Sequence, residues 1–401
     1  MLGAMLAVVA LILGLARVSL AIGSGPRLPA GRPRLPVLDG LRTLLISYVI
    51  LYHCRDTMAP KQLGFIFAKA QSTMHYFSPI MGFVNFWVNK QDRISLGAAC
   101  TDLARRLDRL CPGYYLALLW LYAFGAYQYD PLAYPLQALF LQTLLPIRVC
   151  GLVYDSYAWH GANSDGWFVS AAVVCAVCFP MLYNARPRRG WQATAMVLLA
   201  VLTFCASTRW MRSHIDLYME GLNIYVWAPP RVLEFFAGMF FAQLANELPE
   251  HLKSWPGWPY ISDLCLGMAF VVVATSDSAM PTLAEDWFLT PLFGLHALSC
   301  SLTECSLARP DESGHFQRGC LDTLLSSHLL VDAAQYSFGA YILQQPVRLS
   351  ITYLLQCLGS GPTAASWIMQ LVSCWTAGMA LTKFVENPVA RVMSSRLKAR
   401  A

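Results

Sequence analysis

The sequence predicts an all-α polytopic integral membrane protein, and three observations support this fold class. Hydrophobic residues make up 56% of the 401 residues and charged residues 13%, whereas soluble domains carry about 25% charged residues. The mean hydropathy is positive, at +0.46. Apolar runs recur from one end of the chain to the other, with no polar block as large as a soluble domain. One membrane domain is therefore the simplest interpretation.

The lengths of the apolar runs predict ten membrane-spanning helices. A spanning helix needs about 20 mainly apolar residues. The segment 66–89 is the least regular of the ten, because His75, Pro79 and Asn85 interrupt it. The predicted spans are residues 37–57, 66–89, 111–129, 166–184, 191–208, 224–246, 259–277, 284–303, 336–358 and 364–385.

Basic residues between the spans predict the orientation of the chain. Lys and Arg collect before the first span, in the connection 90–110, in the turn 185–190 and in the C-terminal tail. All four places lie on one side if the ten helices alternate, and positive loops are typically cytoplasmic. We therefore expect both ends of the ten-helix core in the cytoplasm. The acidic 247–253 loop and the pair Arg209 and Arg212 fit this orientation less well.

Two short segments flank the predicted membrane domain at residues 36–392. Residues 1–35 combine an apolar stretch with a basic Pro/Arg linker. The apolar stretch has the form of a signal peptide, with "SLA" at 19–21 as a cleavage site, but cleavage would place the basic linker outside. An organelle-targeting segment, indicated by the lack of acidic residues before Asp39, and an extra anchor helix are the alternatives. Residues 393–401 form a basic tail expected in the cytoplasm.

The charge and the cysteines argue against two kinds of partner. The net charge is +6, but Lys and Arg lie between apolar runs rather than on one polar face, which argues against nucleic acid. Cys175 and Cys178 form a C-x-x-C without a second ligand pair nearby, whereas a structural zinc site needs four ligands. Both are better interpreted as small buried residues. Cys150, Cys305 and Cys320 could form disulfides if their loops are extracytoplasmic.

Arg42 and His53 are two polar residues in the otherwise apolar first span. Eleven residues advance an α-helix by about three turns, or roughly 16 Å, so the two side chains lie on one helix face. Arg42 alone is explained equally well by contact with lipid headgroups. A charged group at membrane depth usually faces a polar cavity or the bundle interior. For the pair we therefore predict a polar path with Arg42 near the inner surface and His53 in the outer half.

His53 is the strongest candidate for a general base. Imidazole titrates near neutrality, so a neutral ring can take a proton from an attacking hydroxyl. Asp56 lies three residues further on and could hold the ring in one tautomer, or it could be an interfacial charge at the helix end.

Six segments, in this order, resemble membrane proteins of acyltransferase family 3. The first carries "LDGLR" followed by ten residues and a His, and together the six cover roughly residues 36–392. The segments are "LDGLRTLLISYVILYH" (38–53), "ARRLDRLCPGYYLALL" (104–119), "DGWFVSAAVVCAVCFPMLY" (165–183), "PPRVLEFFAGMFFA" (229–242), "YSFGAYILQQPV" (336–347) and "FVENPVAR" (384–391).

The resemblance implies an enzyme that moves an acyl group, typically acetyl, from acyl-CoA to a hydroxyl acceptor, often a carbohydrate. It implies that His53 and Arg42 are the catalytic pair, and that Arg231 and Glu234 match the family's later Arg and Glu. Their i, i+3 spacing predicts a buried pair on one helix face, with either a structural or a functional role. No metal is expected, and the acceptor, acyl length and oligomeric state are left unassigned.

Other residues are assigned supporting roles. Arg105, Arg106 and Arg109 could bind coenzyme A phosphates, because Arg offers bidentate donors, or they could be ordinary positive-inside anchors. The oxyanion of the reaction needs hydrogen-bond donors. By resemblance, the candidates for these and other supporting positions are Asp165, Trp167, Tyr336, Tyr341 and Gln344.

Four positions depart from the family pattern. Ala172 stands where the family usually has Glu, Gln344 where it commonly has His, Met81 where it has Ser, and Thr43 where it has Gly. The lost groups could be redundant or could be replaced by Asp165, His160 or Gln345. The alternatives are a weakened relative that binds acyl-CoA or lipid without turnover, a small-molecule transporter, or a purely structural membrane protein.

Overall fold

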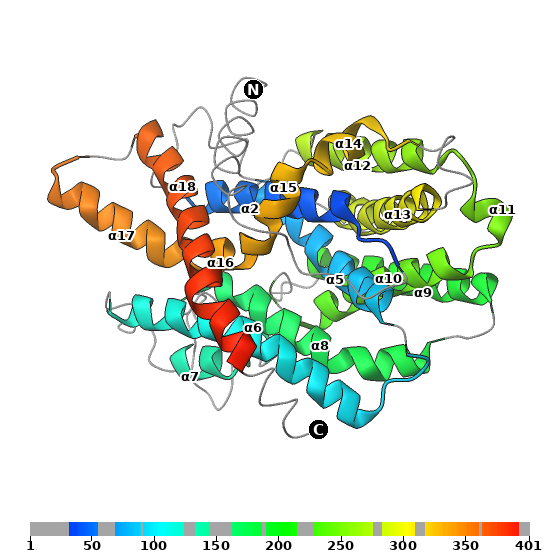
Figure 1. The fold of residues 1–401 in the computed structure, drawn as a ribbon, viewed down its shortest axis with the longest axis horizontal. Coiled ribbons are helices and arrows are strands. Elements are labelled where there is room, and N and C mark those ends of the chain that lie inside the picture. The colour runs from blue at the N-terminus through cyan, green and yellow to red at the C-terminus, as the bar shows by residue number, and fades with distance from the viewer. Residues whose placement is uncertain are drawn as a thin grey trace.

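The chain is a bundle of helices in a computed structural model (Figure 1). The structure describes residues 32–54, 69–89, 91–123, 133–144, 163–186, 190–214, 226, 228–275, 283–308, 317–360 and 363–392. Every regular element among these residues is helical, which confirms the all-α class. Residues 1–31 of the predicted N-terminal segment, the C-terminal tail, Asp56, Cys150 and His160 lie outside the described residues.

The long helices follow the apolar runs of the sequence. Short helices and 3₁₀ turns join them. The elements are α2 (Pro36–His53), η1 (Ala70–Thr73), α5 (Met74–Val88), α6 (Leu96–Ala123), α7 (Ala133–Ala138), η3 (Ser164–Gly166), α8 (Trp167–Ala185), α9 (Trp191–His214), α10 (Ala228–Glu247), α11 (Glu250–Lys253), α12 (Trp258–Thr275), α13 (Leu283–Leu307), α14 (Cys320–Leu325), α15 (His328–Ala333), η4 (Ala334–Tyr336), α16 (Ser337–Ile342), α17 (Gln344–Cys357), α18 (Ala364–Leu381) and η5 (Thr382–Glu386).

Helices α5 and α10 lie in direct backbone contact at the centre of the bundle. Helix α10 also packs against α8, α9 and α13. A Cβ atom on Gly82 of α5 would lie 1.8 Å from the carbonyl oxygen of Phe235, and one on Gly238 of α10 would lie 1.7 Å from that of Pro79. The two glycines therefore permit an approach that a larger residue would block.

Helices α12 and α13 lie side by side at one edge of the bundle, with α14 across them (Figure 1). Helix α14 also touches α2, where a Cβ on Gly40 would lie 1.8 Å from the carbonyl oxygen of Leu325. The other end of α2 approaches the side of the bundle that carries α16 and α17. The first helix thus connects two parts of the molecule that are far apart in the sequence.

Three of the described helices are long and apolar enough to cross a membrane: Trp167–Ala185, Trp258–Thr275 and Ala365–Val392. Together with the all-helical fold they indicate a membrane protein. The count of ten spans and the orientation of the chain stay predictions.

Two predicted boundaries are wrong. The connection expected at 90–110 is helical from Leu96 onward, as the first half of α6. Its residues are good helix formers, and Asp102 pairs at 2.7 Å with Nε of Arg106 one turn later. The single span expected at 336–358 is two helices, α16 and α17, which meet at Leu343.

Pro346 accounts for the break between α16 and α17. Proline has no N–H, so it cannot donate to the carbonyl of Ile342 four residues earlier. That carbonyl instead accepts a hydrogen bond from Nδ2 of Asn163 at 3.3 Å. The broken helix is therefore connected to the turn that precedes α8.

Candidate active site

His53 ends helix α2 and contacts a buried carboxylate. Its Nε2 lies 3.2 Å from Oδ1 of Asp165, and the side chains are 30% and 2% exposed, respectively. A carboxylate only accepts hydrogen bonds when ionised, so it places the proton of a neutral imidazole on Nε2 and leaves Nδ1 as the acceptor. The sequence suggested Asp56 for this orienting role, but Asp56 lies outside the described residues, and the contact that the structure describes is made by Asp165.

The backbone of Asp165 is held on both sides. Its N–H donates to Oδ1 of Asn163 at 3.2 Å, and its carbonyl accepts from the hydroxyl of Tyr341 at 2.7 Å. Asn163 is fully buried, and its N–H and carbonyl both bond to the side chain of Gln137. The carboxylate next to His53 therefore belongs to a turn, η3, whose backbone is held by hydrogen bonds from side chains of α7 and α16.

Arg348 of α17 also reaches the end of α2. Its guanidinium donates to the carbonyl oxygen of His53 at 2.6 Å. A cation at a helix C-terminus satisfies an orphan carbonyl and opposes the negative end of the helix dipole. The sequence analysis did not identify Arg348 as a site residue. A signal was available, because an Arg inside a predicted span usually faces a polar partner.

Arg42 lies in a separate group of contacts nearer the start of α2. Its side chain is 42% exposed, and Nη2 lies 3.0 Å from Oδ1 of Asp39. The same nitrogen donates to the carbonyl of Ala334 at 3.1 Å. Arg42 and His53 thus share a helix but not their partners, and a polar path between them stays a prediction.

Arg231 and Glu234 form the close pair that their spacing indicates. Nη1 of Arg231 donates to both carboxylate oxygens at 2.8 and 3.0 Å. Nδ1 of His75, from α5, lies 2.9 Å from the same carboxylate. All three side chains are at most 2% exposed. The sequence had shown His75 only as an interruption of a span.

A family model for an acyltransferase domain matches residues 35–382, most of the chain. The chain belongs to acyltransferase family 3. The family supports an acyltransferase that resides in a membrane. Searches of curated proteins and of solved structures each found no match to the chain.

Three positions of the family motifs can be compared with the structure. The Trp167 ring is buried, and its centroid lies 5.7 Å from the guanidinium carbon of Arg231. Gln344, where the family commonly has His, is 1% exposed, and neither its amide nitrogen nor its amide oxygen has a partner among the described residues. Ala172, at the position of the family's Glu, is half-buried on α8.

The basic residues predicted to bind coenzyme A lie on α6. Arg105 and Arg109 are exposed. Arg106 is half-buried and contacts the carboxylate of Asp102 and, at 2.7 Å, the side-chain oxygen of Asn85. Through its contact with Asn85, Arg106 links α6 to α5. Of the three arginines, only Arg105 and Arg109 are exposed.

The cysteines of the described residues form no disulfide with one another. Cys175 is buried and Cys178 half-buried, which agrees with their interpretation as small packing residues. Within the described part of the chain, Cys305 and Cys320 are therefore not joined by a disulfide.

Proposed function

We propose that this acyltransferase moves an acyl group, with acetyl as the first candidate, from acyl-CoA to a hydroxyl group, with a carbohydrate as the favoured acceptor. The observation that carries the proposal is the His53–Asp165 pair, in which a partly exposed imidazole contacts a buried carboxylate. Membership of acyltransferase family 3 supports the reaction class.

In the proposed step, His53 acts as the general base. Nδ1 takes the proton of the acceptor hydroxyl while its oxygen attacks the thioester carbonyl. The tetrahedral intermediate then breaks its C–S bond, and the imidazolium returns the proton to the leaving thiolate of coenzyme A. The products are an ester and free coenzyme A, and His53 is neutral again.

Asp165 would stabilise the imidazolium that forms during this step. The carboxylate is close enough to offset the positive charge, and its buried position limits screening by water. The oxyanion also needs a donor. Gln344 is the best candidate because its buried amide nitrogen has no partner, whereas the Tyr341 hydroxyl already donates to Asp165.

We assign donor binding to basic residues toward the side expected to face the cytoplasm. Arg42 would orient the acyl-CoA or balance its negative charge, since its half-exposed guanidinium keeps donors for a second partner. Arg105 and Arg109 would contact coenzyme A phosphates. Both ends of the membrane domain would then be cytoplasmic.

A comparison of His53→Ala with wild type tests the base assignment. Purified full-length protein in detergent is incubated with acetyl-CoA and a panel of sugar acceptors, and release of free coenzyme A is measured. Loss of the base should lower kcat by about 10²- to 10⁴-fold. The matched control is His251→Gln, at an exposed His on α11. Equal rates for His53→Ala and wild type, with both folded, would dismiss the assignment.

Acyl-CoA binding without turnover is a second candidate, favoured by Ala172 at the position of the family's Glu. It predicts saturable binding of acetyl-CoA by wild type but no release of free coenzyme A with any acceptor. Restoring the carboxylate with Ala172→Glu should then create activity that wild type lacks.

A further inference from the structure

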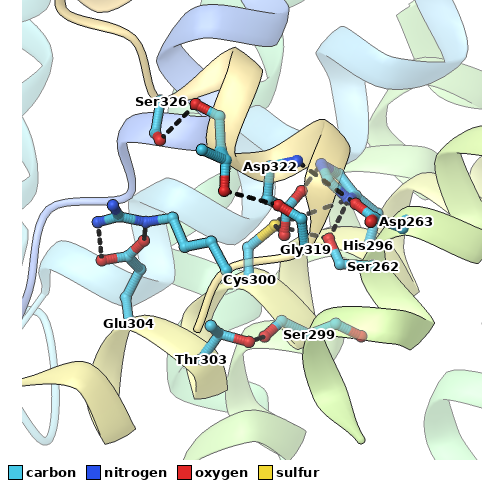
Figure 2. Close-up of polar contacts among 12 residues, drawn as sticks. Ser262, Asp263, His296, Ser299, Cys300, Thr303, Glu304, Gly319, Asp322 and Ser326 are labelled. Atoms are coloured by element: carbon cyan, nitrogen blue, oxygen red, sulfur yellow. Dashed lines mark hydrogen bonds and ion pairs between the residues drawn. The ribbon is translucent and has the colours of Figure 1, made fainter. Parts of the chain in front are cut away.

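Three side chains that can ligate a metal ion meet where α13 and α14 cross, and Figure 2 shows them together. His296 and Cys300 stand one turn apart on α13, and Asp322 comes from α14. One ligand atom of each lies within 4.8 Å of the others. All three side chains are at most 1% exposed. Imidazole, thiolate and carboxylate are the ligand types of zinc sites.

The distances within this cluster fit tetrahedral coordination. Sγ of Cys300 lies 3.7 Å from Nε2 of His296 and 3.7 Å from Oδ2 of Asp322. With zinc bonds of about 2.3 Å to sulfur and about 2.0 to 2.2 Å to nitrogen or oxygen, tetrahedral ligand atoms lie about 3.5 Å apart. Two of the three separations are thus within a few tenths of an ångström of this value. The third, between the ligand atoms of His296 and Asp322, is within 4.8 Å and would shorten on binding.

Ser262 of α12 orients the imidazole of this cluster. Its hydroxyl lies 2.9 Å from Nδ1 of His296 and 3.2 Å from Sγ of Cys300. A hydroxyl that accepts from Nδ1–H leaves the lone pair of Nε2 directed toward the other ligands. Metal-bound histidines usually have such a partner on the second nitrogen.

The carboxylate of Asp322 is incompletely satisfied. Oδ1 has no hydrogen-bond partner, and the described residues hold no ion pair to Asp322. The nearby cation Arg318 instead pairs with Glu304 through two contacts of 2.6 and 3.0 Å. A bound cation would supply the missing partner.

Two carboxylates hold the segment that presents Asp322. Asp263 accepts the backbone N–H groups of Cys320 and Leu321 at 2.6 and 3.1 Å and thereby attaches α14 to α12. A Cβ on Gly319 would lie 2.5 Å from this carboxylate. The Arg318–Glu304 pair attaches the preceding residue to α13 (Figure 2). The third ligand is therefore placed before any metal binds.

We propose that His296, Cys300 and Asp322 bind one Zn²⁺ ion, with Ser262 beside the fourth position. Binding would release the thiol proton of Cys300, and one thiolate and one carboxylate would neutralise the divalent cation. The ion would tie α14 to α13, and α14 in turn packs against Gly40 of α2, the helix of Arg42 and His53.

The resemblance to acyltransferase family 3 implies no metal, and His296 and Cys300 on α13 with Asp322 on α14 match no recognised motif spacing. The inference departs from that prediction but does not depend on acyl transfer. It concerns a site that the proposed reaction does not use.

Metal content tests the site directly. Full-length protein is purified in detergent with a tag that lacks histidines, equilibrated with excess zinc, freed of unbound metal and measured by mass spectrometry. Wild type should hold about one zinc per chain, as expected for a single mononuclear site. Cys300→Ser and Asp322→Asn should lose it. Cys265→Ser, which removes a buried thiol on a different helix, α12, should retain the zinc.

Two further measurements keep the test decisive if a variant folds poorly. Wild-type protein stripped by a chelator and loaded with Co²⁺ should show a thiolate-to-cobalt absorption band that Cys300→Ser lacks. Ser262→Ala should weaken zinc affinity by about 10- to 100-fold. Wild-type protein that retains no zinc and gives no cobalt band would overturn the proposal, and the cluster would then be a hydrogen-bonded network only.

Discussion

Among the residues that the structure describes, two histidine–carboxylate pairs differ in their surroundings. His53 and Asp165 lie 3.2 Å apart, with the imidazole 30% exposed. His75 and Glu234 lie 2.9 Å apart, with the imidazole fully buried. The carboxylate of the second pair also binds Arg231, which balances its charge inside the protein. A histidine–carboxylate contact therefore occurs at an accessible helix end for His53 and in the core for His75.

This difference indicates which pair can react. A general base must come within hydrogen-bond reach of a substrate proton, and a fully buried imidazole does not meet that requirement without movement. A buried charged network instead depends on all its members, because removing one leaves another charge unpaired. We therefore expect the His53 pair to control turnover and the His75 pair to control stability.

The largest expected effect is on turnover, in Asp165→Asn. An amide at this position can donate to the imidazole and favour the wrong tautomer, so kcat should fall by about 10²- to 10⁴-fold while the protein stays folded. Release of coenzyme A and thermal unfolding are measured together. The control is Glu250→Gln, the same chemical change at an exposed residue of α11. A fall in stability without a fall in kcat would show that the His53–Asp165 pair has a structural role, like the His75–Glu234 pair.

The second effect is on stability, in Glu234→Gln. This change removes the charge of the carboxylate that pairs with the fully buried guanidinium of Arg231. Breaking a buried ion pair on one side lowers the free energy of unfolding by about 3 to 5 kcal/mol. Unfolding in detergent by heat or denaturant measures the loss. Wild-type stability in this variant would show that the buried network is not a structural element.

A smaller loss is expected from Gly238→Ala, which acts on the backbone contact between the helices of His75 and Glu234. The new methyl group would meet the carbonyl of Pro79, and overpacking of this kind typically lowers the free energy of unfolding by about 1 to 3 kcal/mol. Gly267→Ala in α12 is the control, since a Cβ there has no neighbour within 4 Å. If both variants unfold alike, the close approach of α5 and α10 does not support the buried pair.

The smallest effect is expected from Tyr341→Phe, which removes one hydrogen bond to the backbone of Asp165. The net contribution of such a bond is about 0.5 to 1.5 kcal/mol. The expected loss in kcat is therefore below about 15-fold, since 1.4 kcal/mol corresponds to a factor of 10. Tyr353→Phe on the exposed side of α17 serves as the control. A loss as large as that of Asp165→Asn would show that Tyr341 contacts the substrate.

Much of the helical framework could be predicted from the sequence. Helix α8 ends at Ala185 and α9 begins at Trp191, on either side of the predicted turn, and the predicted pair Arg231 and Glu234 is present. Both features depend on local patterns, the length of an apolar run and the i, i+3 spacing on one helix. The break at Leu343 was missed, although Pro346 was a local signal for it.

Local patterns in the sequence predict the membrane class, most of the long helices, and Arg42 and His53 on one face of the first helix. The contacts of Asp165 with His53, of His75 with the buried ion pair and of Asp322 with His296 and Cys300 are seen only in the folded chain. They are seen only there because helix periodicity relates residues within a few turns. Contacts between distant segments depend instead on how whole helices pack, which a single sequence pattern does not encode.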